Sequence, residues 1–250
     1  MSEYKVLTAG DTALVVEFGD RVDRKLSTFV LALARRLDES HVEGIVETVP
    51  TYRSLMVHYD PLVIGTDALV ARIVALMEDS RTVVEQAGRE WRLPACYDAE
   101  LAPDLADVAA RTGLTPAQVI ERHSAVSYHV YMLGFMPGLA YMGDVPPELV
   151  LARRETPRLK IPAGTLAIGT TMTCIFPRES PCGIHLIGRS PVTLWRPQTK
   201  AGTGPGALLA PGDKVVFAPI SLREYNDLAA RAAAGVLEVE PVNAWTGAAA

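Results

Sequence analysis

The residues best suited to chemistry lie between His123 and Pro197. Arg158 and Lys160 are separated by one residue in the motif TPRLKIPAG, so on an extended segment both side chains point to the same face. Two cations on one face suit an anion, and an arginine can bind a carboxylate or phosphate through two parallel hydrogen bonds. We therefore expect an anion site here, with Arg153 and Arg154 just upstream; the alternative is a solvated basic edge that discourages strand pairing.

The motif GFMPG at 134–138 is a second candidate. Two glycines and a proline in five residues predict a tight turn, which lets backbone amides approach a ligand. Phe135 and Tyr141 would either stack on that ligand or fill the end of a barrel. A plain strand-to-strand turn, with Pro137 and Gly138 serving only the backbone, is the alternative.

Hydroxyl and imidazole groups form a third set. Thr173 belongs to the run GTTMTC at 169–174, whose hydroxyls could line a polar pocket. His123 is expected at the end of a helix, where it would either act on a ligand or stabilise the helix C-terminus. Together with His129 and His185 it shows no metal-ligand spacing, so we expect no metal site.

Composition limits the classes of function. Hydrophobic residues make up 49% and charged residues 21%, which is typical of a folded domain, and no apolar run is long enough to cross a membrane. The net charge is −5, yet residues 151–200 hold eight Lys or Arg against two acidic residues. This basic island favours a small anion or an acidic partner over nucleic acid. Three cysteines without a CxxC pair indicate reduced, structural thiols in the cytoplasm.

Hydrophobic periodicity predicts two domains and a tail. The first shows a strand, helix, strand, strand, helix order, followed by apolar residues near Val83, which is close to a ferredoxin-like unit. After a polar linker, two short helices, many short strands and a capped helix predict a closed β-barrel with peripheral helices. The expected elements are strands 12–18, 42–49 and 55–59 and helices 25–38 and from Thr66; then linker 85–90, helices 103–111 and 115–122, strands over 128–217, helix 221–234 and strand 236–239. The domains are predicted at 1–88 and 89–240, with a tail at 241–250.

Several motifs in this order resemble one family. They are GDTALVVEFGD (10–20), VPTYRSLMVHYDP (49–61), LPACYD (93–98), GFMPGLAYMG (134–143), TPRLKIPAG (156–164) and LIGRSP (186–191). The chain resembles the family of the 5-oxoprolinase B component (PxpB), whose members are also called KipI or allophanate hydrolase subunit 1. The resemblance covers nearly the whole chain. It implies an α+β fold, with a ferredoxin-like N-terminal domain followed by a cyclophilin-like closed β-barrel.

The resemblance also implies an activity. The family's B component acts with a homologous C component (PxpC) and an A component (PxpA) to open 5-oxo-L-proline to L-glutamate, driven by ATP, and is expected to be inactive without them. Neither a GxxxxGK[ST] nor a GxGxxG motif occurs in the sequence, so ATP with magnesium is expected in the assembled complex and not on this chain alone. Arg158 and His123 are the expected catalytic residues. The expected substrate-binding residues are Lys160, Phe135, Pro137, Gly138, Tyr141, Pro162, Gly164, Thr173 and Arg189.

Departures from the family pattern leave the substrate open. Met172 stands where Gln is common, and Cys182-Gly183-Ile184 replaces a Gly-Gly-Trp pattern, which removes an amide and an indole. Two alternatives to the oxoprolinase remain. One is a urea carboxylase or allophanate hydrolase module, which would need a biotinylated carrier, although the chain has no biotin-acceptor motif. The other is a KipI-like inhibitor that docks on a sensor histidine kinase.

Overall fold

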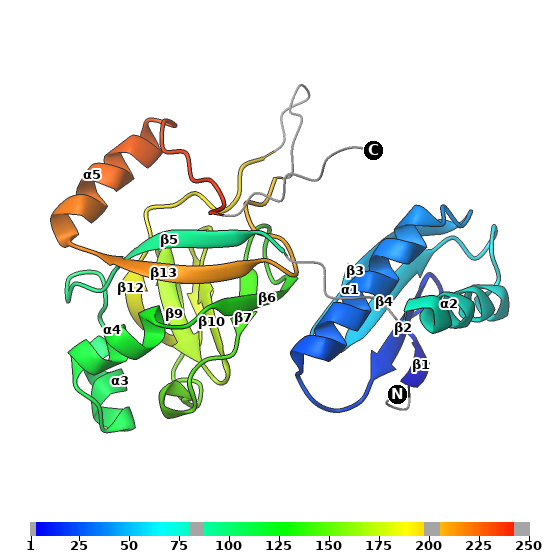
Figure 1. Cartoon of the computed structure of the whole chain (residues 1–250), viewed down its shortest axis with the longest axis horizontal. Coiled ribbons are helices and arrows are strands. Elements are labelled where there is room, and N and C mark those ends of the chain that lie inside the picture. The colour runs from blue at the N-terminus through cyan, green and yellow to red at the C-terminus, as the bar shows by residue number, and fades with distance from the viewer. Residues whose placement is uncertain (1–3, 81–87, 198–205, 243–250) are drawn as a thin grey trace. The chain divides into compact units, whose positions relative to one another are not determined.

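The computed structural model describes residues 4–80, 88–197 and 206–242. The chain divides into two compact units, residues 1–87 and 88–250, and each is described by itself (Figure 1). Within the described ranges, no helix combines the length and the apolar character that a membrane span requires.

The first unit is a four-stranded antiparallel sheet with both helices packed on one face (Figure 1). Its strand order is β1-β2-β4-β3. The elements are β1 (Tyr4–Thr8), β2 (Ala13–Phe18), α1 (Arg24–Glu39), β3 (Ile45–Pro50), β4 (Ser54–Tyr59) and α2 (Thr66–Ser80). This arrangement confirms the ferredoxin-like expectation for the N-terminal part.

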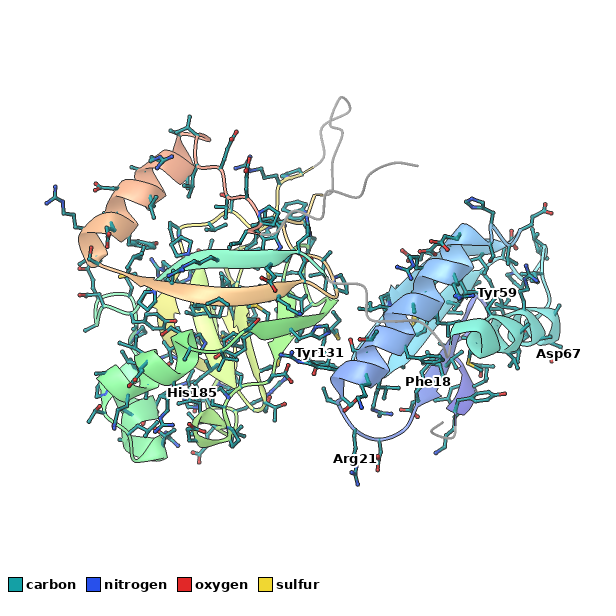
Figure 2. The ribbon with its side chains drawn as sticks, viewed as in Figure 1. Phe18, Arg21, Tyr59, Asp67, Tyr131 and His185 are labelled. Atoms are coloured by element: carbon teal, nitrogen blue, oxygen red, sulfur yellow. The ribbon has the colours of Figure 1, made fainter. Side chains whose placement is uncertain are left out.

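Alternation along the strands builds the core of this unit. β2 and β4 bury every second side chain beneath α1 and α2, including Phe18 and Tyr59, both labelled in Figure 2. Asp23 caps α1 by accepting hydrogen bonds from the backbone amides of Lys25 and Leu26. The sequence pattern does not predict β1, because its side chains are mostly exposed and carry little alternation. The apolar residues near Val83 lie outside the described residues.

The second unit is a closed barrel of seven strands with a separate two-stranded ribbon. The barrel order is β10-β7-β6-β13-β5-β12-β9, and β8 pairs with β11 in the ribbon. The elements are β5 (Glu90–Cys96), α3 (Leu105–Thr112), α4 (Pro116–Ser124), β6 (Tyr128–Leu133), β7 (Ala140–Gly143), a 3₁₀ turn (Pro147–Leu149), β8 (Arg158–Ile161), β9 (Thr165–Gly169), β10 (Met172–Ile175), β11 (Ser180–Cys182), β12 (His185–Arg189), β13 (Lys214–Ile220) and α5 (Leu222–Ala233).

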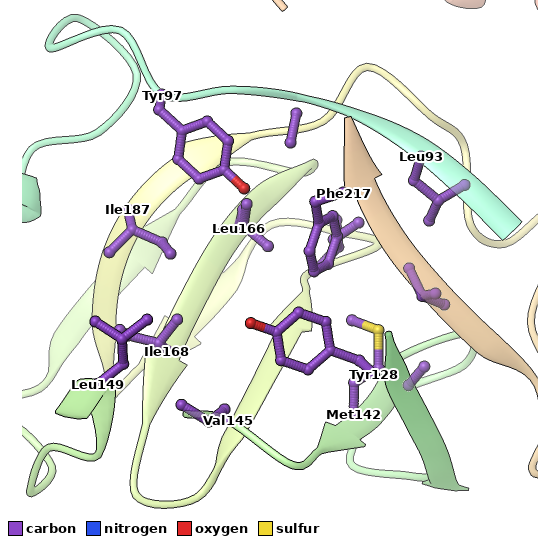
Figure 3. Close-up of a cluster of buried hydrophobic side chains, with 14 of the residues drawn as sticks. Leu93, Tyr97, Tyr128, Met142, Val145, Leu149, Leu166, Ile168, Ile187 and Phe217 are labelled. Atoms are coloured by element: carbon purple, nitrogen blue, oxygen red, sulfur yellow. The ribbon is translucent and has the colours of Figure 1, made fainter. Parts of the chain in front are cut away.

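Two apolar clusters hold this unit together. The larger fills the barrel with side chains such as Leu93, Tyr128, Leu166 and Phe217 (Figure 3). Alternate residues of β9, β10 and β12 contribute instead to a smaller cluster, which also contains residues of β8 and β11. The sheet therefore separates a barrel interior from a second apolar layer beneath the ribbon.

The helix boundaries follow their caps. Thr115 and Ser221 form capping boxes with Gln118 and Glu224, confirming the predicted starts of α4 and α5. The strand expected at 236–239 is wrong. This segment is irregular and pairs with no strand among the described residues, so the alternation of exposed Val236 and buried Leu237 arises from side-chain packing alone.

Candidate functional site

A small cavity lies beside the second apolar cluster. Its volume is about 140 Å³, and it lies where the 134–138 turn, β7, β10 and the end of β11 meet. The lining consists of three aromatic rings, apolar and sulfur-bearing residues and one cation: Phe135, Tyr141, Phe176, Leu139, Ile184, Pro181, Gly183, Met172, Cys174, Cys182 and Arg153. The structure thus brings two of the expected substrate-binding residues, Phe135 and Tyr141, to one pocket.

The 134–138 turn separates this cavity from a more open one. Phe135 adopts a φ of +66°, which is uncommon for a non-glycine residue, and its side chain is 66% exposed. Gly138 has a φ of +79°, and a Cβ there would lie 2.5 Å from the Cβ of Trp195. Pro137 and Gly138 line the open cavity of about 620 Å³ together with Phe135 and Trp195. The exposed ring of Phe135 therefore lines both cavities.

Asp104 organises the basic island from beneath. This carboxylate is 4% exposed and accepts hydrogen bonds from both terminal nitrogens of Arg158, at 2.8 and 2.6 Å. Arg154 donates at 3.1 Å, and the backbone amide of Leu186 donates at 2.8 Å. Burial alone would raise the pKa of Asp104, but the hydrogen bonds and charges of these partners outweigh it and lower the pKa. Arg158 thus lies in a bidentate ion pair, and its expected catalytic role stays a prediction.

Two other cations of the expected anion site, Lys160 and Arg189, also lie outside the small cavity. Lys160 pairs with Glu179 at 2.9 Å on the surface, and neither Lys160 nor Arg158 lines the small cavity. Arg189 is partly buried, and its Nε has no hydrogen-bond partner among the described residues. The Cγ of Arg189 lies 3.3 Å from where a Cβ on Gly164 would be.

The loop that carries Pro162 and Gly164 is held by hydrogen bonds within the protein. The carbonyl of Pro162 accepts a hydrogen bond from the hydroxyl of Thr165. The amide of Gly164 donates to Phe176 at 2.7 Å, and a Cβ there would lie 2.4 Å from the carbonyl oxygen of Ser190. These contacts explain the glycine by close backbone approach, and a role in binding substrate stays a prediction for both residues.

His123 lies inside the barrel and is fully buried. Its Nδ1 is 2.8 Å from the hydroxyl of Tyr97, and its Nε2 is 3.0 Å from the hydroxyl of Thr173. Thr173 donates its own proton to the carbonyl of Ala167, so it accepts from Nε2, and Tyr97 donates to Nδ1. The ring stacks on Phe217 at 4.9 Å. This series of hydrogen bonds gives both ring nitrogens of His123 a partner within the protein.

Burial controls the protonation of this network. Desolvation lowers the pKa of His123 to about 3, because a charged ring inside the barrel would lose its hydration. Burial also raises the pKa of Tyr97 well above its usual value. His123 is therefore neutral at physiological pH. Its expected catalytic role, and substrate binding by Thr173, stay predictions, while the geometry shows both groups bonded within the barrel.

The cysteines are structural in this geometry. Cys96, Cys174 and Cys182 are all free and buried. Burial raises the pKa of Cys174, and the neighbouring Cys182 raises it further. Burial is also the main cause of the raised pKa of Cys182. Both thiols in the cavity wall are therefore protonated and unreactive at neutral pH.

Two functional groups escape prediction from the sequence. Asp104 falls within the helix expected at 103–111, and nothing local marks it as the partner of residues 50 and 54 positions further on. Arg153 is visible in the sequence only as a cation upstream of Arg158, yet it is the arginine that lines the small cavity. Within the described ranges, no group of three or more His, Cys, Asp or Glu side chains could hold a metal.

Comparison with known proteins places this chain in a family. The model of the carboxyltransferase domain, subdomain C and D, matches residues 4–203, and the chain belongs to this family. The B component of 5-oxoprolinase from Escherichia coli O157:H7 is 36% identical over 220 residues, which is 88% of this chain and 97% of that protein. The protein of the same name from Bacillus subtilis is 32% identical over 240 residues, covering 89% and 95%.

Solved structures agree on the fold. The crystal structure of TTHA0988 superposes with a TM-score of 0.72 at 32% identity, over 83% of this chain and 40% of that chain. The present chain therefore spans less than half of that longer protein. The Kluyveromyces lactis urea amidolyase gives a TM-score of 0.79 at 21% identity, over 95% of this chain and 16% of that one, which is a likeness of fold.

Proposed function

We propose that this chain is the B component of an ATP-dependent 5-oxoprolinase, a multi-subunit enzyme that converts 5-oxo-L-proline to L-glutamate. The observation that carries the proposal is the match, at 32–36% identity, to two proteins named as the B component of 5-oxoprolinase, along 95–97% of their length. The E. coli and B. subtilis proteins bear that name; the assignment to this chain is ours.

The chemistry explains why a basic surface is useful. The substrate carries a carboxylate, and transfer of a phosphoryl group from ATP to the lactam oxygen would add a second anionic group before water opens the ring. Cations and backbone amides held in fixed positions stabilise such charge. In this proposal Arg158 and Arg154 are anchored by Asp104, so they hold the segment from residue 151 to 160 in place.

Partner proteins complete the proposed enzyme. The sequence has no phosphate-binding glycine loop, so ATP with magnesium is assigned to the assembled complex. A homologous C component and an A component are the proposed partners. The exposed ring of Phe135 and the open cavity beside it are surfaces that such a partner would cover.

Reconstitution tests the proposal. The chain is combined with C-type and A-type components from the same organism, and glutamate release from 5-oxo-L-proline is measured with and without ATP. We expect ATP-dependent glutamate release from the three-component mixture and none when this chain is omitted. A mixture that assembles but releases no glutamate, or releases it equally well without this chain, would contradict the proposed function.

A further inference from the structure

Among the four cations of residues 153–160, the structure separates one arginine from the other three. Asp104 holds Arg154 and Arg158, and Glu179 pairs with Lys160. Within the described ranges, Arg153 makes no ion pair and no side-chain hydrogen bond, and it lines the small cavity. Of the four cations at 153–160, the one available to an external anion is therefore Arg153 rather than the expected Arg158.

The backbone on both sides of Arg153 is pinned. The carbonyl of Leu151 accepts a hydrogen bond from the amide of Thr170, and the carbonyl of Ala152 accepts one from Nε2 of His185 at 3.1 Å. On the other side, the amide of Arg154 donates to Gly183, which itself lines the cavity.

These bonds fix where the side chain of Arg153 starts. Anchoring at 151, 152 and 154 reduces the conformational freedom that a ligand would otherwise have to remove. These bonds fix the backbone of Arg153 at the cavity, and its exposed side chain supplies a guanidinium that can bind an anion there.

The cavity limits what this arginine can bind. A volume of about 140 Å³ is close to that of a cavity of about 150 Å³ known to hold benzene, so it suits a compact molecule with one small ring. The walls contributed by Leu139, Phe176 and Ile184 are apolar, so they favour methylene groups over further charges.

The polar groups in the wall are uncharged at neutral pH. Burial raises the pKa of Tyr141, nearby Cys174 raises it further and Arg153 partly opposes the rise, so the phenol keeps its proton and is uncharged. The raised pKa values of Cys174 and Cys182 keep both thiols neutral as well. Arg153 therefore provides the formal charge at this cavity.

We propose that this cavity is the substrate subsite for a small cyclic amide carrying one carboxylate, with Arg153 binding the carboxylate and the apolar walls contacting the ring. Tyr141 and Phe135 contact the same ligand from the cavity wall. The proposal rests on the proposed function, because that function supplies a substrate of this chemistry, a five-membered lactam acid.

The test compares Arg153→Gln with Arg153→Lys in the reconstituted three-component complex. Arg223→Gln is the matched control, since it removes the same charge from an exposed position on α5. For each complex we measure kcat and KM for 5-oxo-L-proline and for 2-pyrrolidinone, which has the ring but no carboxylate. Equilibrium binding of 5-oxo-L-proline is measured separately by calorimetry, and thermal unfolding checks that each variant is folded.

We expect Arg153→Gln to raise KM and weaken binding of 5-oxo-L-proline by roughly 10- to 100-fold, since a charge-assisted hydrogen bond is lost. The kcat and KM for 2-pyrrolidinone should stay near those of the wild type. The preference of the complex for the substrate that carries a carboxylate is then largely lost. Arg153→Lys should recover part of the affinity, and Arg223→Gln should behave as the wild type.

The outcomes separate this subsite from the function. A complex that turns over normally with Arg153→Gln, with unchanged selectivity, refutes the subsite and leaves the oxoprolinase assignment intact. A complex without turnover that still binds 5-oxo-L-proline through Arg153 supports the subsite and refutes the assignment. A complex that neither binds nor turns over the substrate refutes both.

Discussion

The buried His123 predicts that acid destabilises the barrel in a defined range of pH. In the unfolded chain this imidazole has an ordinary pKa near 6.5, whereas burial lowers it to about 3 in the folded barrel. Below pH 6.5 the unfolded state binds a proton that the folded state does not. The free energy of unfolding therefore falls as the pH drops through 6.5 and stops responding to this group below about 3.

The size of the effect follows from the two pKa values. Between pH 7 and pH 5 the protonation of the unfolded chain lowers the free energy of unfolding by about 2 kcal/mol, and over the full range by roughly 4–5 kcal/mol. Other groups also titrate, so the contribution of His123 is the difference between the wild type and His123→Gln. The variant should be less stable at pH 7, because it disturbs the contacts to Tyr97 and Thr173, but about 2 kcal/mol less sensitive to acid between pH 7 and pH 5.

Tryptophan fluorescence is a suitable assay. Trp91 and Trp195 lie in the barrel unit and residues 1–87 contain no tryptophan, so urea denaturation followed by fluorescence reports on that unit. His41→Asn removes a histidine outside the barrel unit, at an exposed position with positive φ, and should leave the barrel's pH profile at that of the wild type. If His123→Gln does not fold, nitrogen-15 NMR of the wild type should still show a neutral ring with the proton on Nε2 at pH 5. Parallel stability profiles for wild type and variant, or a ring that titrates near 6.5, would refute the reasoning.

Two further changes test the packing of the site. Asp104→Asn should lower the free energy of unfolding of the barrel by about 3 kcal/mol, because two arginines lose their buried counter-charge; Asp107→Asn, on the same helix but in an exposed pair, should cost less than about 0.5 kcal/mol, and equal losses would contradict the role of the buried carboxylate. Gly138→Ala should cost about 2 kcal/mol or more by denaturation and alter the fluorescence of Trp195, since it adds a clash at 2.5 Å to an unfavourable φ. Gly113→Ala has a similar φ with open space around it and should cost about 1 kcal/mol, so identical values would show that the contact with Trp195 is not limiting.

Elements with strong local signals were predictable from the sequence. The amphipathic stripe of α1 and the capping boxes of α4 and α5 depend on residues a few positions apart, and all three helices begin within a residue of the expected place. The edge strand β1 and the irregular 236–239 segment are not predicted correctly, because their structure does not depend on nearby residues. Whether such short segments join a sheet depends on a partner distant in sequence, not on their own pattern.

In the candidate site, too, features set by neighbouring residues were predictable and those set by distant residues were not. The motif at 134–138 indicates a special turn, and the structure shows positive φ at Phe135 and Gly138 there. The sequence predicts the anion site around Arg158, because the spacing of Arg158 to Lys160 is a local feature. The pairing of Arg158 with a carboxylate at the start of α3 is not local, since Asp104 lies 54 residues away.

The amino-acid sequence alone determined the two-domain α+β organisation, the family resemblance and the location of the basic island, because hydrophobic periodicity, capping residues and motif order are local properties. Only the tertiary structure decided which cation of that island is neutralised and which lines a cavity. The reason is physical: a charge is available to a ligand only when no buried counter-charge binds it, and that counter-charge comes from a distant part of the chain.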